Sequence, residues 1–345
     1  MMNLIGMSQG DIDRIIKELC EPKYRATQIY KWIYKDKISS IDEMTNIPKN
    51  LRDKLKSKFE IKHLKVEKVF KDEKDFTHKF LIGLNDNNLI ECVLMKYSFG
   101  YTLCISTQVG CRMGCKFCAS TLDGMVRNLN SGEIIDQIIV IEQFLSINIS
   151  NIVLMGSGEP LDNYNEVLKF INNVNNPNGM NFGQRHITLS TCGIIPKIYD
   201  LAEENLKINL SCSLHAPNNV IRSRIMPINN KYPIEELIKA CKYYTDKTGR
   251  RITFEYAMVK RTNDSIQCAK ELESLLKGMI CLINLIPINE IEESSFIKSE
   301  KNNIMKFSNY LNKRGITTTI RRELGSNINA ACGQLRRDTL NNLER

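Results

Sequence analysis

Apolar residues recur at helical spacing through the first sixty residues of the chain. Ser8 and Asp11 form the pattern of an N-terminal capping box, and isoleucines and leucines follow at intervals of three and four residues. Pro48 suits the first turn of a later helix, and one face of the stretch Lys49–Lys58 is largely basic. This pattern predicts a small helical domain over residues 1–60.

The hydrophobic period changes to two after residue 60, as it does in strands with one buried face. Apolar residues alternate over Phe76–Leu84, the turn sequence Asn85–Asn88 follows, and a second apolar run extends over Leu89–Met95. Two such runs joined by a turn predict a hairpin, so we expect a short antiparallel β extension over residues 61–96.

Beyond residue 96, strand-like apolar runs alternate with amphipathic helical stretches. The runs are Thr102–Ser106, Ile152–Met155, Ile187–Ser190, Ile208–Ser213, Ile252–Val259, Leu282–Pro287 and Thr317–Arg321. Helical candidates between them include Ser131–Leu145, Asn163–Asn173, Ile234–Thr245 and Ser265–Lys277. About six successive βα units predict an α/β domain over residues 97–345, with a parallel sheet covered by helices. The periodicity fits a barrel-like and a doubly wound arrangement equally well.

The bulk composition indicates a globular protein. The chain has 345 residues and a hydrophobic content of 42%, enough to fill a large core. No run of eighteen apolar residues is present, and Met1–Gly6 lacks the basic region and apolar stretch of a signal peptide. We therefore expect a cytoplasmic protein with no membrane association. The formal charge of +9 suits a polyanionic partner without requiring one.

Twelve cysteines are many for a chain without an export signal, and in a reducing compartment they are more often metal ligands, reactive thiols or core residues than disulfides. Cys111, Cys115 and Cys118 follow the first strand of the α/β domain at C-x3-C-x2-C spacing. Three thiolates this close can bind three irons of a [4Fe–4S] cluster and leave the fourth iron open to an outside molecule. A closed zinc site would need a fourth Cys or His, and no His lies near in sequence. The spacing favours a cluster over zinc and over simple core packing.

The octapeptide Cys111–Cys118, with an aromatic residue before its last cysteine, resembles the signature of the radical-SAM superfamily. The resemblance implies a partial (β/α)6 barrel with its site at the carboxyl ends of the strands. It also implies that S-adenosylmethionine chelates the open iron, and that its reductive cleavage yields a 5′-deoxyadenosyl radical. Gly158-Glu159-Pro160 resembles the superfamily's GEP motif: the glycine allows close approach of the backbone, and the carboxylate can accept a hydrogen bond from the methionine ammonium.

Nearly the whole chain resembles the RlmN/Cfr family of adenine methyltransferases. The motifs that carry the likeness are Gln108–Cys111, Gly158–Leu161, Ser213–Pro217, Met226–Asn229 and Ala330–Leu335. Several residues at strand ends match the family's cofactor-binding positions, although polar residues commonly end strands. They are Ser190, Ser213, Leu214, His215 and Asn289.

The resemblance also assigns roles to three residues outside the cluster motif. Cys332 corresponds to the methyl carrier, which accepts a methyl group from one S-adenosylmethionine before a second molecule supplies the radical. Cys104 corresponds to the thiol that resolves a covalent protein–RNA intermediate by forming a transient disulfide with Cys332. Glu91 corresponds to the proton acceptor. Without the resemblance, buried cysteines and a solvent-facing glutamate would be the ordinary interpretation.

The resemblance implies methylation of the C2 carbon of adenosine in 23S rRNA, at the peptidyl transferase centre, and in the tRNA anticodon loop. It further implies an electron donor such as a flavodoxin-type protein, and we expect a monomer. The alternatives are the sister activity at the C8 carbon and a non-catalytic iron–sulfur RNA-binding protein. Arg321-Arg322 and Arg336-Arg337 flank Cys332 and offer phosphate contacts, as does the basic face of residues 49–58, although each also suits a solvated surface.

Overall fold

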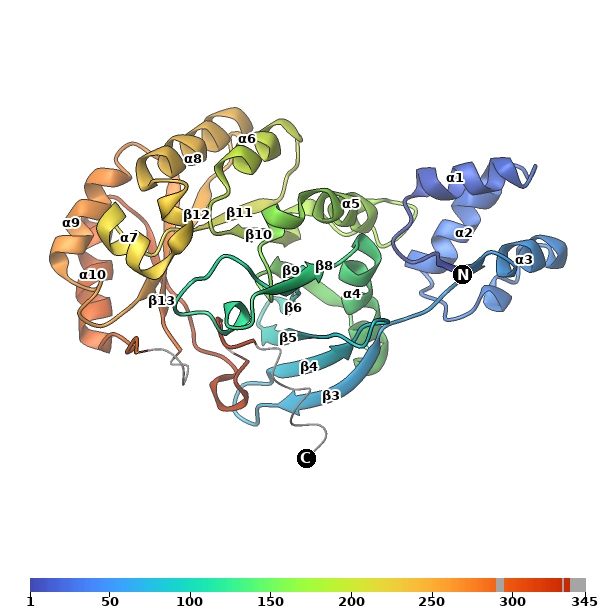
Figure 1. Ribbon diagram of the computed structural model, residues 1–345, viewed down its shortest axis with the longest axis horizontal. Coiled ribbons are helices and arrows are strands. Elements are labelled where there is room, and N and C mark those ends of the chain that lie inside the picture. Colours follow the sequence, from blue (N-terminus) through green and yellow to red (C-terminus); the bar gives the residue numbers. More distant parts are fainter. Residues whose placement is uncertain (290–294, 331, 336–345) are drawn as a thin grey trace.

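The structure, a computed structural model, describes residues 1–289, 295–330 and 332–335, so the basic pair Arg336-Arg337 lies outside the described residues. Within these ranges, ten strands form one mixed sheet in the order β14-β13-β12-β11-β10-β9-β6-β5-β4-β3 (Figure 1). One half of this sheet is parallel and the other is antiparallel, and the two halves meet at β6.

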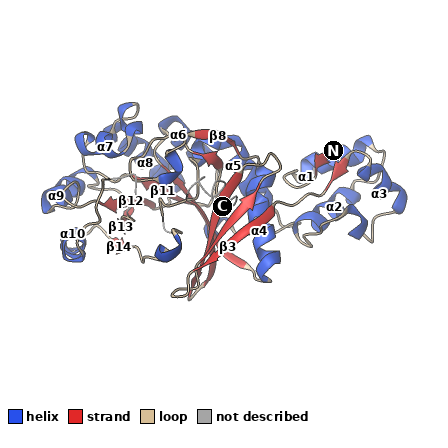
Figure 2. Cartoon of the chain, turned by 60° about the horizontal axis from the view of Figure 1, so that its bottom comes forward, coloured by secondary structure: helices blue, strands red, loops and turns tan. Residues whose placement is uncertain are grey.

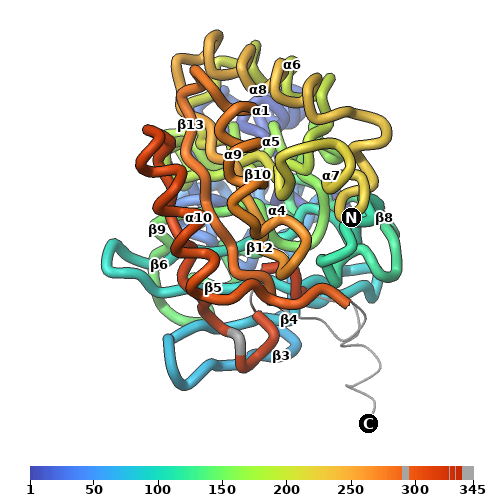
Figure 3. Tube along the Cα trace, turned by 90° about the vertical axis from the view of Figure 1, so that its left-hand side faces the viewer, coloured from blue at the N-terminus to red at the C-terminus, as the bar shows by residue number. Residues whose placement is uncertain are grey.

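The parallel half comprises β6 (Gly100–Cys104), β9 (Ile149–Leu154), β10 (Ile187–Thr191), β11 (Asn209–Ser213), β12 (Ile252–Met258), β13 (Cys281–Pro287) and β14 (Thr318–Ile320). Its helices are α4 (Ser131–Leu145), α5 (Tyr164–Asn175), α6 (Ile195–Glu203), α7 (Asn219–Ile225), α8 (Ile234–Thr248), α9 (Ile266–Leu275) and α10 (Lys301–Lys313). Figure 3, seen from the barrel end, shows α8, α9 and α10 arranged around the strands, with β3 and β4 below them.

The order of the parallel strands decides between the two arrangements that the sequence left open. A doubly wound sheet reverses its strand order at a switch point, whereas a barrel adds each strand beside the previous one. Here β6, β9, β10, β11, β12, β13 and β14 are neighbours in sequence order without reversal. The prediction of a partial (β/α)6 barrel is confirmed, with six βα units followed by β14.

The antiparallel half contains β3 (Lys65–Lys71), β4 (His78–Gly83) and β5 (Leu89–Tyr97). The turn predicted at Asn85–Asn88 joins β4 to β5, and a second hairpin joins β5 to β6. The predicted β extension therefore continues the barrel sheet instead of packing as a separate layer. Figure 2 shows these strands between the N-terminal helices and the barrel helices.

The N-terminal part consists of β1 (Met2–Asn3), α1 (Gln9–Glu18), α2 (Tyr24–Tyr34), α3 (Lys49–Lys56) and β2 (Phe59–Glu60), and it projects from one side of the barrel (Figure 1). The capping box predicted at Ser8 and Asp11 opens α1. The hydroxyl of Tyr30 donates to the backbone carbonyl of Asn173 across 3.1 Å, which ties α2 to the end of α5.

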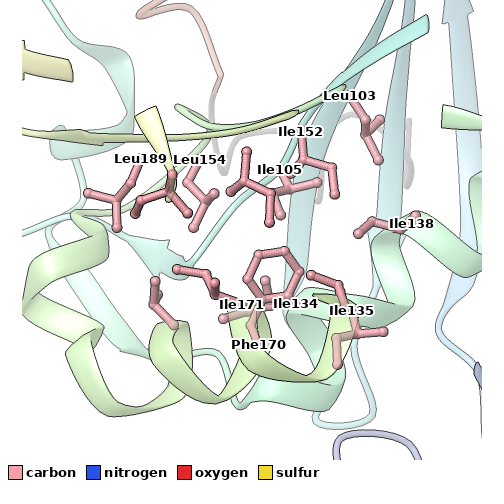
Figure 4. Packing of buried hydrophobic residues seen from close by; sticks show 14 of the residues in the cluster. Leu103, Ile105, Ile134, Ile135, Ile138, Ile152, Leu154, Phe170, Ile171 and Leu189 are labelled. Atoms are coloured by element: carbon pink, nitrogen blue, oxygen red, sulfur yellow. The ribbon is translucent and has the colours of Figure 1, made fainter. Parts of the chain in front are cut away.

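The main core lies between the parallel strands and the helices that cover them. Figure 4 shows Leu103, Ile152 and Leu189 on the sheet facing Ile138 and Phe170 on α4 and α5, and all five side chains are buried. Burial of β-branched and aromatic side chains on this face fixes the strand register, because a shift by one residue would expose them. No helix within the described ranges is long and apolar enough to cross a membrane.

A small hairpin that the sequence did not predict frames the cysteine loop. It consists of β7 (Gln108–Gly110) and β8 (Met125–Asn128), which pair antiparallel on either side of the three cysteines. Short 3-10 helices lie at Ile41–Glu43, Ala119–Thr121, Pro160–Asn163, Gln184–His186, Pro227–Asn230 and Ser326–Ile328. The pairing of β7 with β8 holds the two ends of the cysteine loop together and so restricts the positions of the three cysteines.

Candidate active site

A cavity of about 1020 Å³ opens at the carboxyl ends of the parallel strands. Ten of the residues that the sequence singled out line it: Cys111, Cys115, Cys118, Gly158, Glu159, Ser190, Ser213, His215, Asn289 and Cys332. They come from six separate segments of the chain. The tertiary structure thus brings the cysteine loop, the strand-end residues and the C-terminal cysteine to one place.

The cysteine loop is held by backbone hydrogen bonds at both of its ends. Cys111 donates its N–H to the carbonyl of Gly124 across 3.0 Å, and Lys116 donates to the carbonyl of Ile225 across 2.9 Å. Burial raises the pKa of Cys111 to about 12 and also raises the pKa of Cys115. Buried thiols ionise when a positive charge compensates for the lost water, as a bound metal does. Burial alone therefore favours the protonated thiols, and ligation of a metal would reverse that preference.

The arrangement of possible metal-ligand side chains indicates what kind of metal group the site can hold. Across the residues that the structure describes, no three His, Cys, Asp or Glu side chains are grouped so as to hold one metal ion. The three thiols instead border a cavity wide enough for a larger group. A [4Fe–4S] cluster needs three cysteine ligands and more room than a single metal ion, and this cavity offers both.

The turn after β9 places a buried carboxylate beside the cysteine loop. Gly158 has a φ of +109°, and a Cβ at this position would lie 2.7 Å from the side chain of Gln108, so only glycine fits. Glu159 accepts backbone hydrogen bonds from Leu161 at 3.0 Å and from Cys192 at 2.7 Å, one on each oxygen. Burial raises the pKa of Glu159 despite these bonds. Each oxygen retains a lone pair, so the carboxylate can also bind an ammonium group.

His215 lies two residues after the end of β11. Its imidazole ring is neutral, and a hydrogen bond defines its tautomer. Its Nδ1 accepts the backbone N–H of Ala257 across 2.9 Å, which leaves the hydrogen on Nε2. Burial, together with the charge of Arg222, lowers the pKa of His215 to about 3. The ring packs edge-on against Phe117 in the cysteine loop, with centroids 4.8 Å apart. A neutral donor is therefore fixed in the cavity wall next to the proposed cluster ligands.

The remaining strand-end residues lie at different depths. Ser190 and Ser213 line the cavity, whereas the side chain of Leu214 is buried in the hydrophobic core. Leu214 does not line the cavity; its backbone N–H donates to the carbonyl of Glu255, a residue that does, across 3.1 Å. Asn289 donates from its side-chain amide to the carbonyl of Cys332 across 3.3 Å. Asn289 thus contacts the C-terminal loop as well as the cavity.

A second cavity, of about 580 Å³, adjoins the first and is lined by both Cys104 and Cys332. Cys332 is exposed, whereas Cys104 is buried at the end of β6. Burial raises the pKa of Cys104 to about 12, and the proximity of Cys332 adds to the shift. Arg321 and Arg322 line the same cavity. The two thiols that the sequence proposed as a redox pair therefore face a common space with two arginines.

Glu91 lies in β5, away from these two cavities. It is 2% exposed and forms an ion pair with the buried Lys79 at 3.1 Å. It lines a smaller pocket together with Ser120 and Ser157, which adjoin the cysteine loop and the turn after β9. Glu91 therefore lies next to the cysteine loop but does not line the cavity of about 1020 Å³.

Sequence reasoning missed several buried polar residues around the site. Arg222 is fully buried, and its guanidinium donates to the carbonyls of Cys192 at 2.8 Å and of Leu214 and Ser213 at 3.2 Å, and to the Asn229 side chain at 3.0 Å. It lies in a short amphipathic helix, and nothing in the local pattern marks it. Glu255 lines the cavity from β12, and the only signal for it was a charge within an otherwise apolar strand.

The partial barrel, the three-cysteine loop and the glycine–glutamate turn together define a radical-SAM enzyme. In agreement, the family model described as the Radical SAM superfamily matches residues 105–270, and the model described as the ribosomal RNA large subunit methyltransferase N-terminal domain matches residues 2–61. The chain belongs to the RlmN family of RNA methyltransferases.

Three similar proteins support this assignment. The chain is 54% identical to the probable dual-specificity RNA methyltransferase RlmN of Clostridium botulinum strain Alaska E43, across 100% of this chain and 99% of that protein. It is 55% identical to the corresponding protein of Clostridium beijerinckii, across 100% of this chain and 97% of the relative. The crystal structure of a radical SAM methyltransferase from Sphaerobacter thermophilus superposes with a TM-score of 0.93 at 39% identity, across 98% of this chain and 100% of that one.

Proposed function

We propose that the protein methylates the C2 carbon of adenosine in 23S rRNA, at the peptidyl transferase centre, and in the tRNA anticodon loop, with Cys332 as the methyl carrier. One observation carries this proposal: Cys332 lines both the cavity of the three-cysteine loop and the neighbouring cavity of Cys104. A thiol in that position can receive a methyl group on one side and meet a resolving thiol on the other.

The cofactors of the family are a [4Fe–4S] cluster and S-adenosylmethionine, and the described residues fit them. Cys111, Cys115 and Cys118 would hold the cluster, with Gly158 and Glu159 beside it at the methionine end of the cofactor. The other proposed cofactor contacts are Ser190, Ser213, Leu214, His215 and Asn289. When bound, these cofactors supply a methyl group and a radical able to remove a hydrogen atom from an inert carbon.

The protein's own residues then have separate tasks. The Cys332 thiolate would take the methyl group from a first S-adenosylmethionine, which leaves as S-adenosylhomocysteine. Loss of one hydrogen atom from this methyl group, to the radical supplied by the second cofactor molecule, would let its carbon bond to C2 and give a covalent protein–RNA link, with one electron returned to the cluster. Glu91, buried beside Lys79, accepts the proton that leaves C2. The Cys104 thiolate attacks the Cys332 sulfur and forms a disulfide as the carbon–sulfur bond breaks. The released carbon takes up a proton to become the methyl group, the methylated RNA leaves, and a cellular dithiol reduces the disulfide before the next turnover. In this order, Cys332 is methylated in the cavity of the three-cysteine loop and forms its disulfide in the cavity of Cys104.

Several further features belong to the same proposal. The chain divides into a helical accessory domain (residues 1–60) that contacts RNA, a β extension (61–96) that carries Glu91, and a radical-SAM core (97–345). An electron donor such as a flavodoxin-type protein reduces the cluster, and the enzyme acts as a monomer in the cytoplasm, where its RNA substrates and a reducing environment are found.

Mass spectrometry of RNA nucleosides tests the proposal. The reconstituted protein is incubated anaerobically with unmodified 23S rRNA or tRNA, S-adenosylmethionine and a reductant. We expect 2-methyladenosine from the wild type and none from Cys332→Ala. Cys20→Ala is the matched control, because Cys20 is also an exposed thiol but lies in the N-terminal part.

The other outcomes separate the alternatives. 8-Methyladenosine would assign the sister activity instead. Formation of 5′-deoxyadenosine without any methyladenosine would contradict the RNA assignment while retaining the radical chemistry. A protein that holds iron yet forms no 5′-deoxyadenosine would be the non-catalytic RNA-binding alternative.

A further inference from the structure

We propose that Tyr97 and Phe99, in the hairpin between β5 and β6, form a stacking platform for a nucleobase next to the target adenosine; this inference rests on the proposed function. The two rings are nearly parallel, with an interplanar angle of 7° and centroids 5.0 Å apart. Phe99 is 65% exposed, although exposure alone is common for single apolar residues. This pair differs from other exposed apolar residues because Tyr97 lines the cavity of Cys104 and Cys332.

The register of the hairpin places Tyr97, the ring on which Phe99 stacks, on the face of the sheet that carries Cys104. Val93 pairs with Cys104, and Tyr97 pairs with Gly100, so Val93, Met95 and Tyr97 project on one face with Cys104. All four line the cavity that Cys332 also lines. Leu324, Ala330 and Leu335 pack in one apolar cluster with Val93 and Met95 of β5. Tyr97 therefore lines the cavity shared by the proposed methyl carrier and its resolving thiol, and Phe99 stacks on Tyr97 just outside the lining residues.

The charges of the same cavity favour RNA as the occupant. Arg321 and Arg322 line it together with Tyr97, and Glu323, which also lines it, forms an ion pair with Lys298. Proteins that bind single-stranded nucleic acid combine a basic groove, which follows the phosphates, with aromatic rings on which the bases stack. An apolar ligand would gain nothing from the two arginines. The combination thus fits a nucleotide segment better than a lipid or an apolar peptide.

Extrusion of the target adenosine also favours an aromatic stacking partner at this place. An adenosine whose C2 edge must reach a side chain has to leave its stack, and its neighbours lose a stacking partner when it does. A ring at the cavity edge can replace that partner and hold the extruded nucleotide in place. Stacking of this kind contributes about 1–3 kcal/mol per base and is tolerant of base identity.

A second aromatic pair provides a matched control. Tyr199 and Tyr243, on α6 and α8, are also exposed, and their centroids are 5.1 Å apart. Neither residue lines the cavities of Cys104 and Cys332. Removing one ring there also removes exposed aromatic surface, but away from the cavity of Cys104 and Cys332.

The experiment uses the reconstituted full-length enzyme and a stem-loop RNA with an adenosine in its loop. Phe99→Leu should raise the KM for this RNA about tenfold, equivalent to about 1.4 kcal/mol of binding. Phe99→Tyr, which keeps the ring, and Tyr199→Leu should retain the wild-type KM. Formation of 5′-deoxyadenosine in the absence of RNA should be the same in all variants, because the cofactor cavity is unchanged.

A cross-linking measurement shows directly which base stacks. 5-Iodouridine is placed on either side of the target adenosine, the complex is irradiated, and the cross-linked peptide is identified by mass spectrometry. We expect a link to residues 97–99 from one of the two positions. If Phe99→Leu has the wild-type KM and no cross-link to residues 97–99 forms, the stacking platform is disproved. The proposed function would still stand in that case, provided that the wild-type enzyme methylates the RNA. An enzyme that neither binds nor methylates the RNA would overturn both.

Discussion

The backbone N–H of Ala119 donates to the carbonyl of Gly333 across 2.7 Å, which joins the cysteine loop to the residue after Cys332. The Ser120 hydroxyl adds a second link, to the carbonyl of Leu335 across 2.9 Å. The position of the proposed methyl carrier is therefore set by the loop that contains the proposed cluster ligands. Movement of one loop must displace the other.

Gly333→Ala tests this coupling. Gly333 has a φ of +83°, and a Cβ would lie 3.1 Å from the carbonyl oxygen of Phe117, so an alanine would push the C-terminal loop away from the cysteine loop. We expect methyladenosine formation to fall at least about tenfold, the equivalent of about 1.4 kcal/mol, while 5′-deoxyadenosine still forms. The ratio of the two products is measured. Gly315→Ala is the control, since Gly315 has a φ of +81° and open space around its Cβ. Equal ratios in both variants would contradict the coupling.

Cys104→Ala should trap the covalent intermediate. Cys104 and Cys332 line one cavity, and without the second thiol no disulfide can form to release the RNA. We expect a protein–RNA adduct that survives denaturing electrophoresis with labelled RNA, and turnover below a single equivalent. Cys92→Ala is the matched control, because Cys92 is a buried cysteine in the neighbouring strand β5. Multiple turnovers by Cys104→Ala would show that another group resolves the link.

Arg222→Lys should destabilise the barrel next to the cofactor cavity. The guanidinium reaches the carbonyls of Cys192 and Leu214 and the side chain of Asn229 at once, which a lysine ammonium cannot do from one nitrogen. We expect a loss of about 3 kcal/mol in the free energy of unfolding, measured by urea titration. Arg224→Lys, on the exposed side of the same helix, should unfold like the wild type. Equal urea midpoints for Arg222→Lys and Arg224→Lys would disprove the stabilising role of the Arg222 hydrogen bonds.

The contact between the N-terminal part and the barrel should weaken as the pH rises. His63 Nδ1 lies 2.6 Å from the carboxylate of Asp136 on α4, and its Nε2 lies 3.0 Å from the carbonyl of Ile38. Burial acts to lower the pKa of His63, but the bond and charge of Asp136 outweigh it, so the pKa is raised above 6.5. Burial has the opposite effect on the carboxyl group and raises the pKa of Asp136. Since the Asp136 carboxylate raises the pKa of His63, folding favours a protonated His63 beside it.

The sign of the pH effect follows from proton binding. A native state that binds the His63 proton more tightly than the unfolded chain is fully stabilised below about pH 6.5 and loses that stabilisation as the pH rises through the higher folded-state pKa. The thermal midpoint of the wild type should thus fall over this interval, and His63→Gln should remove that part of the dependence. His186→Gln, at an exposed histidine, should leave it intact. A wild-type slope in His63→Gln would refute the assignment.

The local patterns of the chain were sufficient for much of the fold. Alternation of apolar strands with amphipathic helices gave the βα units, because each element's periodicity is encoded within a few residues. The helix predicted at Ser131–Leu145 has the observed bounds of α4. Periodicity could not distinguish a barrel from a doubly wound sheet, since that choice depends on the side on which each strand is added.

The sequence by itself determined the proposed cluster ligands and the carboxylate turn, because Cys111, Cys115 and Cys118 lie on one loop and Gly158 adjoins Glu159 in the chain. Only the tertiary structure decided which distant groups share a space. It placed Cys104 and Cys332 on one cavity, paired Lys79 with Glu91, and set Arg222 across two strand ends. Such pairings depend on how remote elements pack, and no spacing along the chain encodes them.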